Sequence, residues 1–325
     1  MYFQRFIRNV FPVIPRYLFE WDEDVDSYNK RKKSAGFCMK SEKGPGIFGV
    51  IVFLLLPCLL TVVFSGRKAC PVIREIEIED YIPAVTAAQI SWDAPIEAIK
   101  AQTVIARSNL YLEWKKGEAS GTIQEASQEL KKRNMDDLFL EKFQRFQEAS
   151  ADTEGQMLMK DGEVKEIPYH ELSQGKTREA AQILGEAFSY VPQLDTPADT
   201  ESPDYIKGFY FTLEDLKKKL IKSYPGFTIE NAGQIEIKNT DNTGYVLEIQ
   251  IGNQEFQGEK LRELLSLPSS CFTIQTLEDE IRFLCKGQGH GLGLSQHTAI
   301  KMAEEDKTYK EILSFFFPEL SINRK

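Results

Sequence analysis

The sequence predicts an α+β fold, a domain of mixed helices and strands behind a single N-terminal transmembrane helix. Three observations lead to this prediction. An uncharged apolar run stands near the N-terminus, segments with helical and strand periodicity follow it in mixed order, and no internal repeat is visible. A doubly wound fold is disfavoured because strands and helices do not alternate in a regular β-α-β rhythm. The length of 325 residues also exceeds that of one small module.

The apolar run extends from Ile47 to Phe64 and contains no charged residue over 18 positions. A helix of roughly 20 such residues crosses the ~30 Å hydrocarbon core of a bilayer, so we predict a transmembrane anchor at 46–65. A buried core helix and a cleaved signal peptide are the alternatives. Core helices usually keep a polar face, and this run starts too late and is too long for a signal peptide.

The charges that flank the run predict its orientation. Six Lys or Arg residues stand between positions 30 and 43, and three follow the run closely. Because positive charge is retained on the cytoplasmic side, residues 1–45 are a predicted cytoplasmic tail and residues 70–322 a predicted extracytoplasmic domain. We therefore expect a single-pass protein of the cell membrane with its N-terminus in the cytoplasm.

Net charge excludes one class of partner. Residues 1–45 carry nine Lys or Arg and six Asp or Glu, whereas the rest of the chain carries 31 and 43. A surface that binds nucleic acid needs clustered positive charge to meet the phosphates. The acidic balance of the predicted domain therefore makes nucleic acid an unexpected partner.

The first half of the domain begins with alternating residues at 75–80, which predict a short strand. Helical spacing of apolar residues then predicts helices over 82–90 and from 96 onward. Ser91 or Asp93 is the expected cap of the second helix, with Pro95 in its first turn. Residues 116–150 have helical spacing on a polar background, and 151–170 predict strands around a turn at Asp161-Gly162.

The second half continues the mixed pattern. Helices are predicted at 213–224, 258–265, 295–303 and 309–317, and strands at 233–238 and 245–251. Cys271 and Cys285 bracket a predicted β-hairpin with a turn at Leu-Glu-Asp-Glu. They form either a cross-strand disulfide or two reduced, buried thiols.

A glycine-rich stretch at 287–296 precedes the helix predicted at 295–303. Glycines at alternate positions surround His290, so this loop either holds an oxygen-rich ligand at the helix N-terminus or is a tight structural turn. It departs from G-x-G-x-x-G because residue 292 is Leu, which argues against a dinucleotide cofactor. The three histidines, at 170, 290 and 297, lack the spacing of a zinc site, so no metal or other cofactor is expected.

Several motifs in order resemble the stage II sporulation protein D family, which includes amidase-enhancer relatives. The opening motifs are EDYIPAVTAAQ at 79–89 and PIEAIKAQTVIAR at 95–107. The later ones are Asp152–Gly155, Tyr169-His170, Ser173–Thr177, the glycine-rich stretch, Met302-Ala303 and Tyr309–Leu313. Together they span about residues 70–322, which is far more specific than any one motif.

The resemblance implies an activity and a substrate. Sporulation members of the family are lytic transglycosylases that cut peptidoglycan glycan strands and prefer strands without stem peptides. A carboxylic acid protonates the leaving glycosidic oxygen while the 6-hydroxyl of the sugar attacks the anomeric carbon. The family acid is a Glu that ends an Ala-Ala-Glu sequence, and the matching residue here is Gln89. Because an amide transfers no such proton, we expect glycan recognition with weakened or lost cleavage.

Two other functions stay open. A displaced carboxylate, at Asp93, Glu97 or Glu171, would keep the chain an active transglycosylase. Alternatively, the domain is a non-catalytic scaffold for a partner wall hydrolase such as an amidase. Glycan strands, a hydrolase partner and the membrane are thus the expected contacts.

The resemblance also implies a set of substrate-binding residues. They are Arg107, Ser173, Lys176, His290, Ser295 and Gln296. A buried salt bridge is the alternative for Arg107, and simple solvation is the alternative for Lys176. Gln288 stands where an aromatic residue is usual in the family, which would remove a surface for sugar stacking.

Overall fold

The computed structural model describes residue 56 and residues 77–324, without residues 135 and 279. The predicted cytoplasmic tail and, apart from residue 56, the predicted anchor at 46–65 lie outside the described residues. Among the residues that are described, no helix has the length and apolarity needed to cross a membrane. Residues 77–325 form a unit of their own, which mixes helices and small sheets as the α+β prediction stated.

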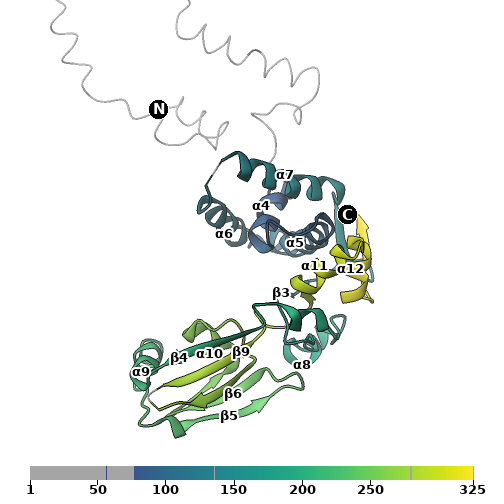
Figure 1. Ribbon diagram of the computed structural model, residues 1–325. Coiled ribbons are helices and arrows are strands. Elements are labelled where there is room, and N and C mark those ends of the chain that lie inside the picture. The colour runs from purple at the N-terminus through teal and green to yellow at the C-terminus, as the bar shows by residue number, and fades with distance from the viewer. Residues whose placement is uncertain (1–55, 57–76, 135, 279, 325) are drawn as a thin grey trace, which may run out of the picture. The chain divides into compact units, whose positions relative to one another are not determined.

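Four helices form one end of this unit, which we call the helical part (Figure 1). They are α4 (Ile82–Gln89), α5 (Ile96–Lys116), α6 (Ser120–Lys131) and α7 (Asp137–Asp152). Their positions confirm the predicted helices at 82–90, from 96 and within 116–150. Pro95 is the N-cap of α5 and no side chain caps that helix, so the expected cap at Ser91 or Asp93 is absent.

The predicted strand at 75–80 is wrong for its described residues, because Ile78–Asp80 form a 3-10 turn, η4. The turn brings Glu79 to Arg107 on α5, where two hydrogen bonds of 2.7 and 3.0 Å join the carboxylate to the guanidinium. A buried charge of this kind needs a partner, so the ion pair outweighs the alternating pattern of the sequence.

The middle of the unit consists of two short sheets and two helices. Strand β1 pairs antiparallel with β2 and β11, and the turn at Asp161-Gly162 has positive φ at both residues, as a tight hairpin requires. Strand β3 pairs in parallel with β10. The elements are β1 (Gln156–Lys160), β2 (Glu163–Val164), β3 (Tyr169–His170), β10 (Leu294–Ser295), α11 (Gln296–Glu304), α12 (Tyr309–Phe316) and β11 (Ser321–Arg324).

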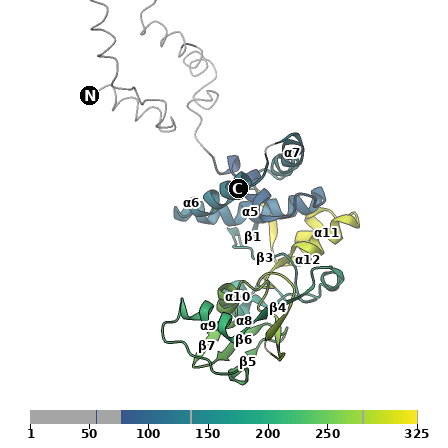
Figure 2. The same ribbon diagram turned by 60° about the vertical axis from the view of Figure 1, so that its left-hand side comes forward.

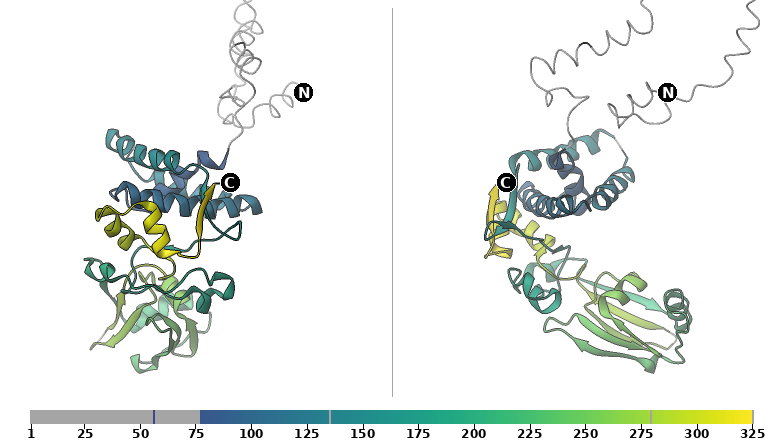
Figure 3. Two further views of the ribbon diagram at one scale, coloured as in Figure 1. Left: turned by 90° about the vertical axis from the view of Figure 1, so that its right-hand side faces the viewer. Right: turned by 180° about the vertical axis from the view of Figure 1, so that it is seen from behind.

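The opposite end, the sheet part, contains two antiparallel three-stranded sheets, ordered β4-β9-β8 and β5-β6-β7. Figures 2 and 3 show these sheets, the middle elements and the helical part in succession. Its elements are β4 (Ile206–Phe211), α9 (Leu213–Ile221), η7 (Ala232–Gln234), β5 (Ile235–Thr240), β6 (Val246–Ile251), β7 (Gln254–Gln257), α10 (Gly258–Leu265), β8 (Phe272–Thr276) and β9 (Ile281–Lys286). Three short helices lead to it: α8 (Ala180–Leu184), η5 (Glu186–Phe188) and η6 (Pro197–Glu201).

An apolar core holds the sheet part together. Phe283 and Ile249 from the two sheets and Leu216 and Leu261 from α9 and α10 are fully buried in one cluster. Burying such a side chain stabilises the fold by roughly 1.5–3 kcal/mol. The core therefore explains why the alternating residues of β6 and β9 form strands that face each other across it.

The predicted hairpin between Cys271 and Cys285 is confirmed as β8 and β9. Both cysteines are free and buried. Burial raises the pKa of the Cys271 thiol to about 11 and that of Cys285 to about 12. The two residues therefore match the reduced-thiol alternative, and their reactive thiolate forms are suppressed.

The sheet part is attached to the glycine-rich loop by a buried arginine. Arg178 donates from Nε to Asp241 at 2.6 Å and from Nη1 to the carbonyl of His290 at 3.0 Å. Its guanidinium also lies 4.6 Å from the centre of the Tyr245 ring. Since Arg178 and Asp241 are both buried, removal of either would leave an uncompensated charge in the interior.

A second buried residue, Asp199 of η6, joins the middle elements. Its carboxylate accepts hydrogen bonds from the backbone N–H of Ser173 at 2.8 Å and from the hydroxyls of Ser295 at 2.8 Å and Thr298 at 2.7 Å. Asp199 and all three donor residues lie in the interior. One carboxylate thus connects the segment after β3, η6 and the first turn of α11.

Asp199→Ala should destabilise the protein by about 3 kcal/mol or more, because three buried donors lose their acceptor. Asp195→Ala is the matched control, since the Asp195 side chain is 75% exposed in its ion pair with Lys176. It should cost less than about 1 kcal/mol. Urea unfolding of the full-length variants measures both free energies, and equal losses would contradict the importance of the buried carboxylate.

Candidate functional site

A cavity of about 480 Å³ lies between α4, α5 and α6, and Gln89 at the end of α4 lines it. Tyr169 of β3 contributes to its wall from the middle of the unit. The remaining lining is part polar and part apolar: Val85, Ala88, Ala106, Asn109, Leu110, Glu113, Thr122, Glu125, Ala126 and Glu129. Helix packing therefore places the residue that the resemblance singles out at a hollow surface.

Three glutamine side chains form a directed hydrogen-bond network at Gln89. Gln296 Nε2 lies 2.7 Å from the backbone carbonyl of Gln89 and 3.2 Å from Gln102 Oε1. Since a carbonyl only accepts, the Gln296 atom must be the NH₂ group, and the Gln102 atom facing it must be oxygen. Gln102 Nε2 then donates to Gln89 Oε1 at 2.9 Å.

The direction of these hydrogen bonds determines which atoms of the Gln89 amide stay available to a ligand. Its Oε1 atom is held by Gln102, which is fully buried on α5. Its Nε2 atom has no hydrogen-bond partner within the described part of the chain. Residue 89 therefore offers donor hydrogens, and no titratable proton, to a molecule in the cavity.

The charge of the cavity is negative. Glu113, Glu125 and Glu129 line it, and the lining residues include no Lys or Arg. Glu113 accepts a hydrogen bond of 2.7 Å from Thr122. The hydrogen bond and positive charge of Lys132 lower the pKa of Glu129, which keeps that carboxylate ionised.

The glycine-rich loop uses its bare backbone for close packing against the protein. At Gly293, with a φ of 71°, a Cβ atom would lie 1.9 Å from the carbonyl oxygen of Pro168. At the start of α11, the N–H of His297 donates to Glu171 O at 3.0 Å and that of Thr298 to Ser295 Oγ at 3.4 Å. These donors are used inside the protein, which fits the structural-turn alternative for this loop.

His170, which is buried, and His290, which is partly buried, pack together here with ring centres 6.0 Å apart. The Leu292 carbonyl lies 3.0 Å from His170 Nδ1, and the Leu292 N–H donates to His290 Nδ1 at 3.1 Å. Burial lowers both pKa values, that of His290 to about 3, so both rings are neutral at physiological pH. No group of three or more His, Cys, Asp or Glu in the described region is placed to hold a metal ion.

Arg107, a predicted sugar ligand, is fully buried and lies among structural partners. Besides the two bonds to Glu79, its guanidinium donates to Ser150 O at 3.1 Å, Thr153 Oγ1 at 3.2 Å and Gln156 O at 3.3 Å. These bonds use all five of its N–H donors. The arrangement corresponds to the salt-bridge alternative and leaves no donor for a sugar.

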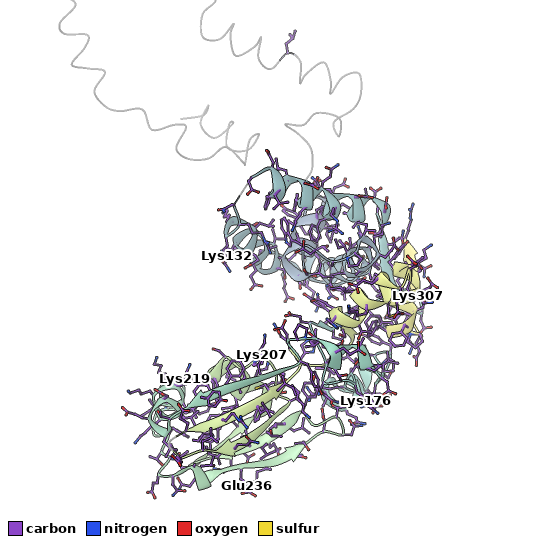
Figure 4. All side chains as sticks on the ribbon, viewed as in Figure 1. Lys132, Lys176, Lys207, Lys219, Glu236 and Lys307 are labelled. Atoms are coloured by element: carbon purple, nitrogen blue, oxygen red, sulfur yellow. The ribbon has the colours of Figure 1, made fainter. Side chains whose placement is uncertain are left out.

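The other predicted ligands are divided among three places. Ser173 and Ser295 are fully buried and meet at Asp199, where Ser295 also caps α11. Lys176, which Figure 4 labels, has a side chain that is 56% exposed and forms an ion pair of 3.1 Å with Asp195. Gln296 alone among them contacts Gln89.

Sequence reasoning missed Gln102 and the cavity glutamates. Gln102 could have been found, because helical spacing puts it on the same face of α5 as the apolar residues Ile99, Ile105 and Ala106. The glutamates carry no such signal. Glu113 comes from α5, whereas Glu125 and Glu129 come from α6, and only the packing of these helices with α4 brings them to the cavity of Gln89.

The three carboxylates suggested as displaced acids differ in environment. Asp93 has a lowered pKa because Lys142 donates a hydrogen bond to it at 2.6 Å. Glu97 is bound by Lys100 at 3.0 Å. Glu171 has a raised pKa, chiefly because it is partly buried.

Comparison with known proteins adds four observations. The family model described as stage II sporulation protein (SpoIID) matches residues 66–159. Stage II sporulation protein D of Bacillus subtilis (strain 168) is 27% identical over 313 residues, which covers 90% of this chain and 89% of that protein. The protein of the same name from Bacillus amyloliquefaciens is 26% identical over 264 residues, covering 77% and 75%. An uncharacterized protein of Brachyspira hyodysenteriae is 30% identical over 257 residues, covering 77% and 68%.

The partly buried His290, whose pKa is lowered, should make stability depend on pH. In the unfolded chain a histidine titrates near 6.5, whereas in the folded protein the pKa is about 3. The unfolded state therefore binds the extra proton, and stability falls as pH decreases from 6.5 toward 3, by up to about 1.4 kcal/mol per pH unit. His290→Asn should flatten this dependence. Urea unfolding at pH 7.0, 5.5 and 4.5 tests this, and parallel curves for the two proteins would contradict it.

Proposed function

The chain belongs to the stage II sporulation protein D family, and from this membership we propose that its domain binds peptidoglycan glycan strands during the cell-wall remodelling of sporulation. The binding site is the cavity beside Gln89. Cleavage of the strand is weakened or lost in comparison with a member that carries Glu at this position. The observation that carries the proposal is the directed amide network at Gln89, a residue that lines the cavity and whose Oε1 is held by Gln102.

The lining of the cavity supports a sugar ligand. Its volume of about 480 Å³ lies in the usual range for small-molecule sites. Gln89, Glu125 and Tyr169 provide hydrogen-bonding groups, and Val85 and Ala88 provide apolar surface. A pyranose ring has both kinds of surface, with hydroxyls around its rim and C–H groups on its faces.

The family reaction explains why residue 89 matters. The glycosidic oxygen is a poor leaving group unless it receives a proton as its bond to the anomeric carbon breaks. A carboxylic acid supplies that proton, whereas Gln89 can only donate a hydrogen bond. Loss of such general-acid help costs roughly 10²–10⁴ in rate.

The surrounding network would also accept a glutamate at position 89. One carboxyl oxygen would take the place of Gln89 Oε1 and receive the hydrogen bond from Gln102 Nε2. The other oxygen would take the place of Nε2 and face the cavity. A single substitution therefore places an acid in the site without rearranging its neighbours.

Gln89→Glu should increase the release of 1,6-anhydro products from purified, stem-peptide-free glycan by about 10²-fold or more. Gln89→Met is the matched control, since it has a similar size and no proton to give. The full-length protein is used, with product release followed by mass spectrometry. Wild-type activity as high as that of Gln89→Glu would contradict the assignment of residue 89.

Glycan binding separates this proposal from the scaffold function. Wild-type protein and Gln89→Met should both sediment with purified glycan strands, whereas a scaffold with an empty groove would stay in solution. The membrane anchor at 46–65 and a partner amidase stay predictions, and neither is needed for this test.

A further inference from the structure

The wall of the cavity beside Gln89 contains carboxylates from two different helices. Glu113 comes from α5, and Glu125 and Glu129 come from α6. Glutamates elsewhere on a domain surface face bulk water, whereas these three line the hollow that the proposed function assigns to a sugar. Their charge therefore acts on any molecule that enters the cavity.

Glu113 and Glu125 belong to one stretch of this wall. The hydroxyl of Thr122 donates to Glu113 Oε2 at 2.7 Å, which joins α6 to α5 at the cavity. Thr122 and Glu125 are three residues apart on α6, and residues at this spacing are neighbours on a helix surface, with Cβ atoms ~5–6 Å apart. The Glu113 carboxylate is thus held next to the residue that neighbours Glu125.

The fold supplies little positive charge to balance this wall. Glu129 pairs at 2.6 Å with Lys132, the C-cap of α6, which Figure 4 labels and which does not line the cavity. Glu113 and Glu125 form no ion pair with any residue that the structure describes. Glu125 and Glu129 are also four residues apart on α6, a spacing at which like charges destabilise a helix. The arrangement therefore opposes folding slightly, and a cationic ligand would relieve it.

Tyr169 shows that the charge of Glu113 reaches across the cavity. Burial raises the pKa of the Tyr169 hydroxyl to about 12, and the negative charge of Glu113 adds to the rise. Both residues line the cavity. The hydroxyl thus stays protonated at physiological pH, inside the field of the carboxylate.

A cation carried on a larger molecule fits this wall better than a metal ion does. Hard metal ions need several oxygen ligands converging within about 2.6 Å. No group of three or more His, Cys, Asp or Glu in the described residues is placed to hold a metal ion. An ammonium group has three donor hydrogens and can bind carboxylates on separate walls of a cavity of about 480 Å³.

The two sugars of a peptidoglycan strand differ in the charge that they can bring. Muramic acid carries a lactyl group, which is a carboxylate once the stem peptide is absent. Glucosamine carries an acetamide, and hydrolysis of that amide by water releases acetate and leaves a free amine that takes up a proton. The wall would repel the first sugar and attract the second in its free-amine form.

We propose that the cavity beside Gln89 prefers a glucosamine residue whose amino group is free and protonated, and excludes the carboxylate of muramic acid. The inference rests on the proposed function, because it assumes a glycan strand in this cavity. Glu113 and Glu125 bind the ammonium group, and Gln89 and Tyr169 are left to the hydroxyls. Strands with acetylated glucosamine still bind through these hydroxyl contacts, and removal of the acetyl groups increases the affinity.

Binding of two oligosaccharides to the full-length protein tests this preference. One is an oligomer of N-acetylglucosamine, and the other is the glucosamine oligomer of the same length. At about pH 6 the glutamates are ionised, and the free amines of the sugar carry protons. Isothermal titration calorimetry should show about fivefold or tighter binding of the glucosamine oligomer. Raising the salt concentration from about 0.05 M to about 0.5 M should remove most of this preference, because salt screens the charges.

Glu125→Gln removes one charge from the wall and keeps the size of the side chain. Its affinity for the glucosamine oligomer should fall about fivefold, and its affinity for the acetylated oligomer should stay unchanged. Glu148→Gln is the matched control, since it makes the same change at an exposed site of α7 that does not line the cavity. Urea unfolding guards against misfolding, because Glu125→Gln relieves the repulsion with Glu129 and should be at least as stable as wild type.

The outcomes separate this inference from the proposed function. Equal affinity of wild type for the two oligomers would overturn the inference. Equal losses in Glu125→Gln and Glu148→Gln would also overturn it, since they would mean general attraction between a cationic sugar and an acidic protein. In both cases sedimentation with stem-peptide-free glycan strands would still support the proposed function. A wild type that binds neither the strands nor the oligomers would overturn the proposed function itself.

Discussion

The buried carboxylate of Asp199 is the constraint on which the arrangement of the candidate site depends. It gathers the N–H of Ser173 and the hydroxyls of Ser295 and Thr298, groups that come from segments far apart in the chain. Each donor would be costly to bury alone, so the three segments are held at one point. As a result the first turn of α11 and the end of β3 lie together, with Gln296 and Glu171 at their junction.

At this junction the chemistry of residue 89 is set by its neighbours as much as by its own side chain. The backbone carbonyl of Gln89 accepts a hydrogen bond from Gln296, so the Gln296 atom that faces it is the NH₂ group. Gln102 therefore turns its oxygen to Gln296 and its NH₂ group to the Gln89 side chain. A buried chain of amides has few ways to satisfy every group, so its orientation is unique. The network therefore fixes which atom of the Gln89 amide accepts a hydrogen bond and which atom is the NH₂ group.

Periodicity was a reliable guide where one face of an element is buried and an unreliable one elsewhere. The helices α4 and α5 and the hairpin of β8 and β9 follow their apolar patterns. The alternating residues at 77–80 form a turn because Arg107 needs Glu79, a partner that no local pattern reveals. Strand β4 was not predicted, since Gly208 interrupts its pattern and its pairing with the distant β9 creates it.

The sequence by itself determined the order of the helices and most strands, and the family. These are local or positional properties, written in spacing and in residue type. Only the tertiary structure decided that Arg107 has no free donor, that Cys271 and Cys285 are separate thiols, and that Gln296 reaches the backbone carbonyl of Gln89. Such facts depend on burial and on contacts between distant segments, and a linear pattern contains neither.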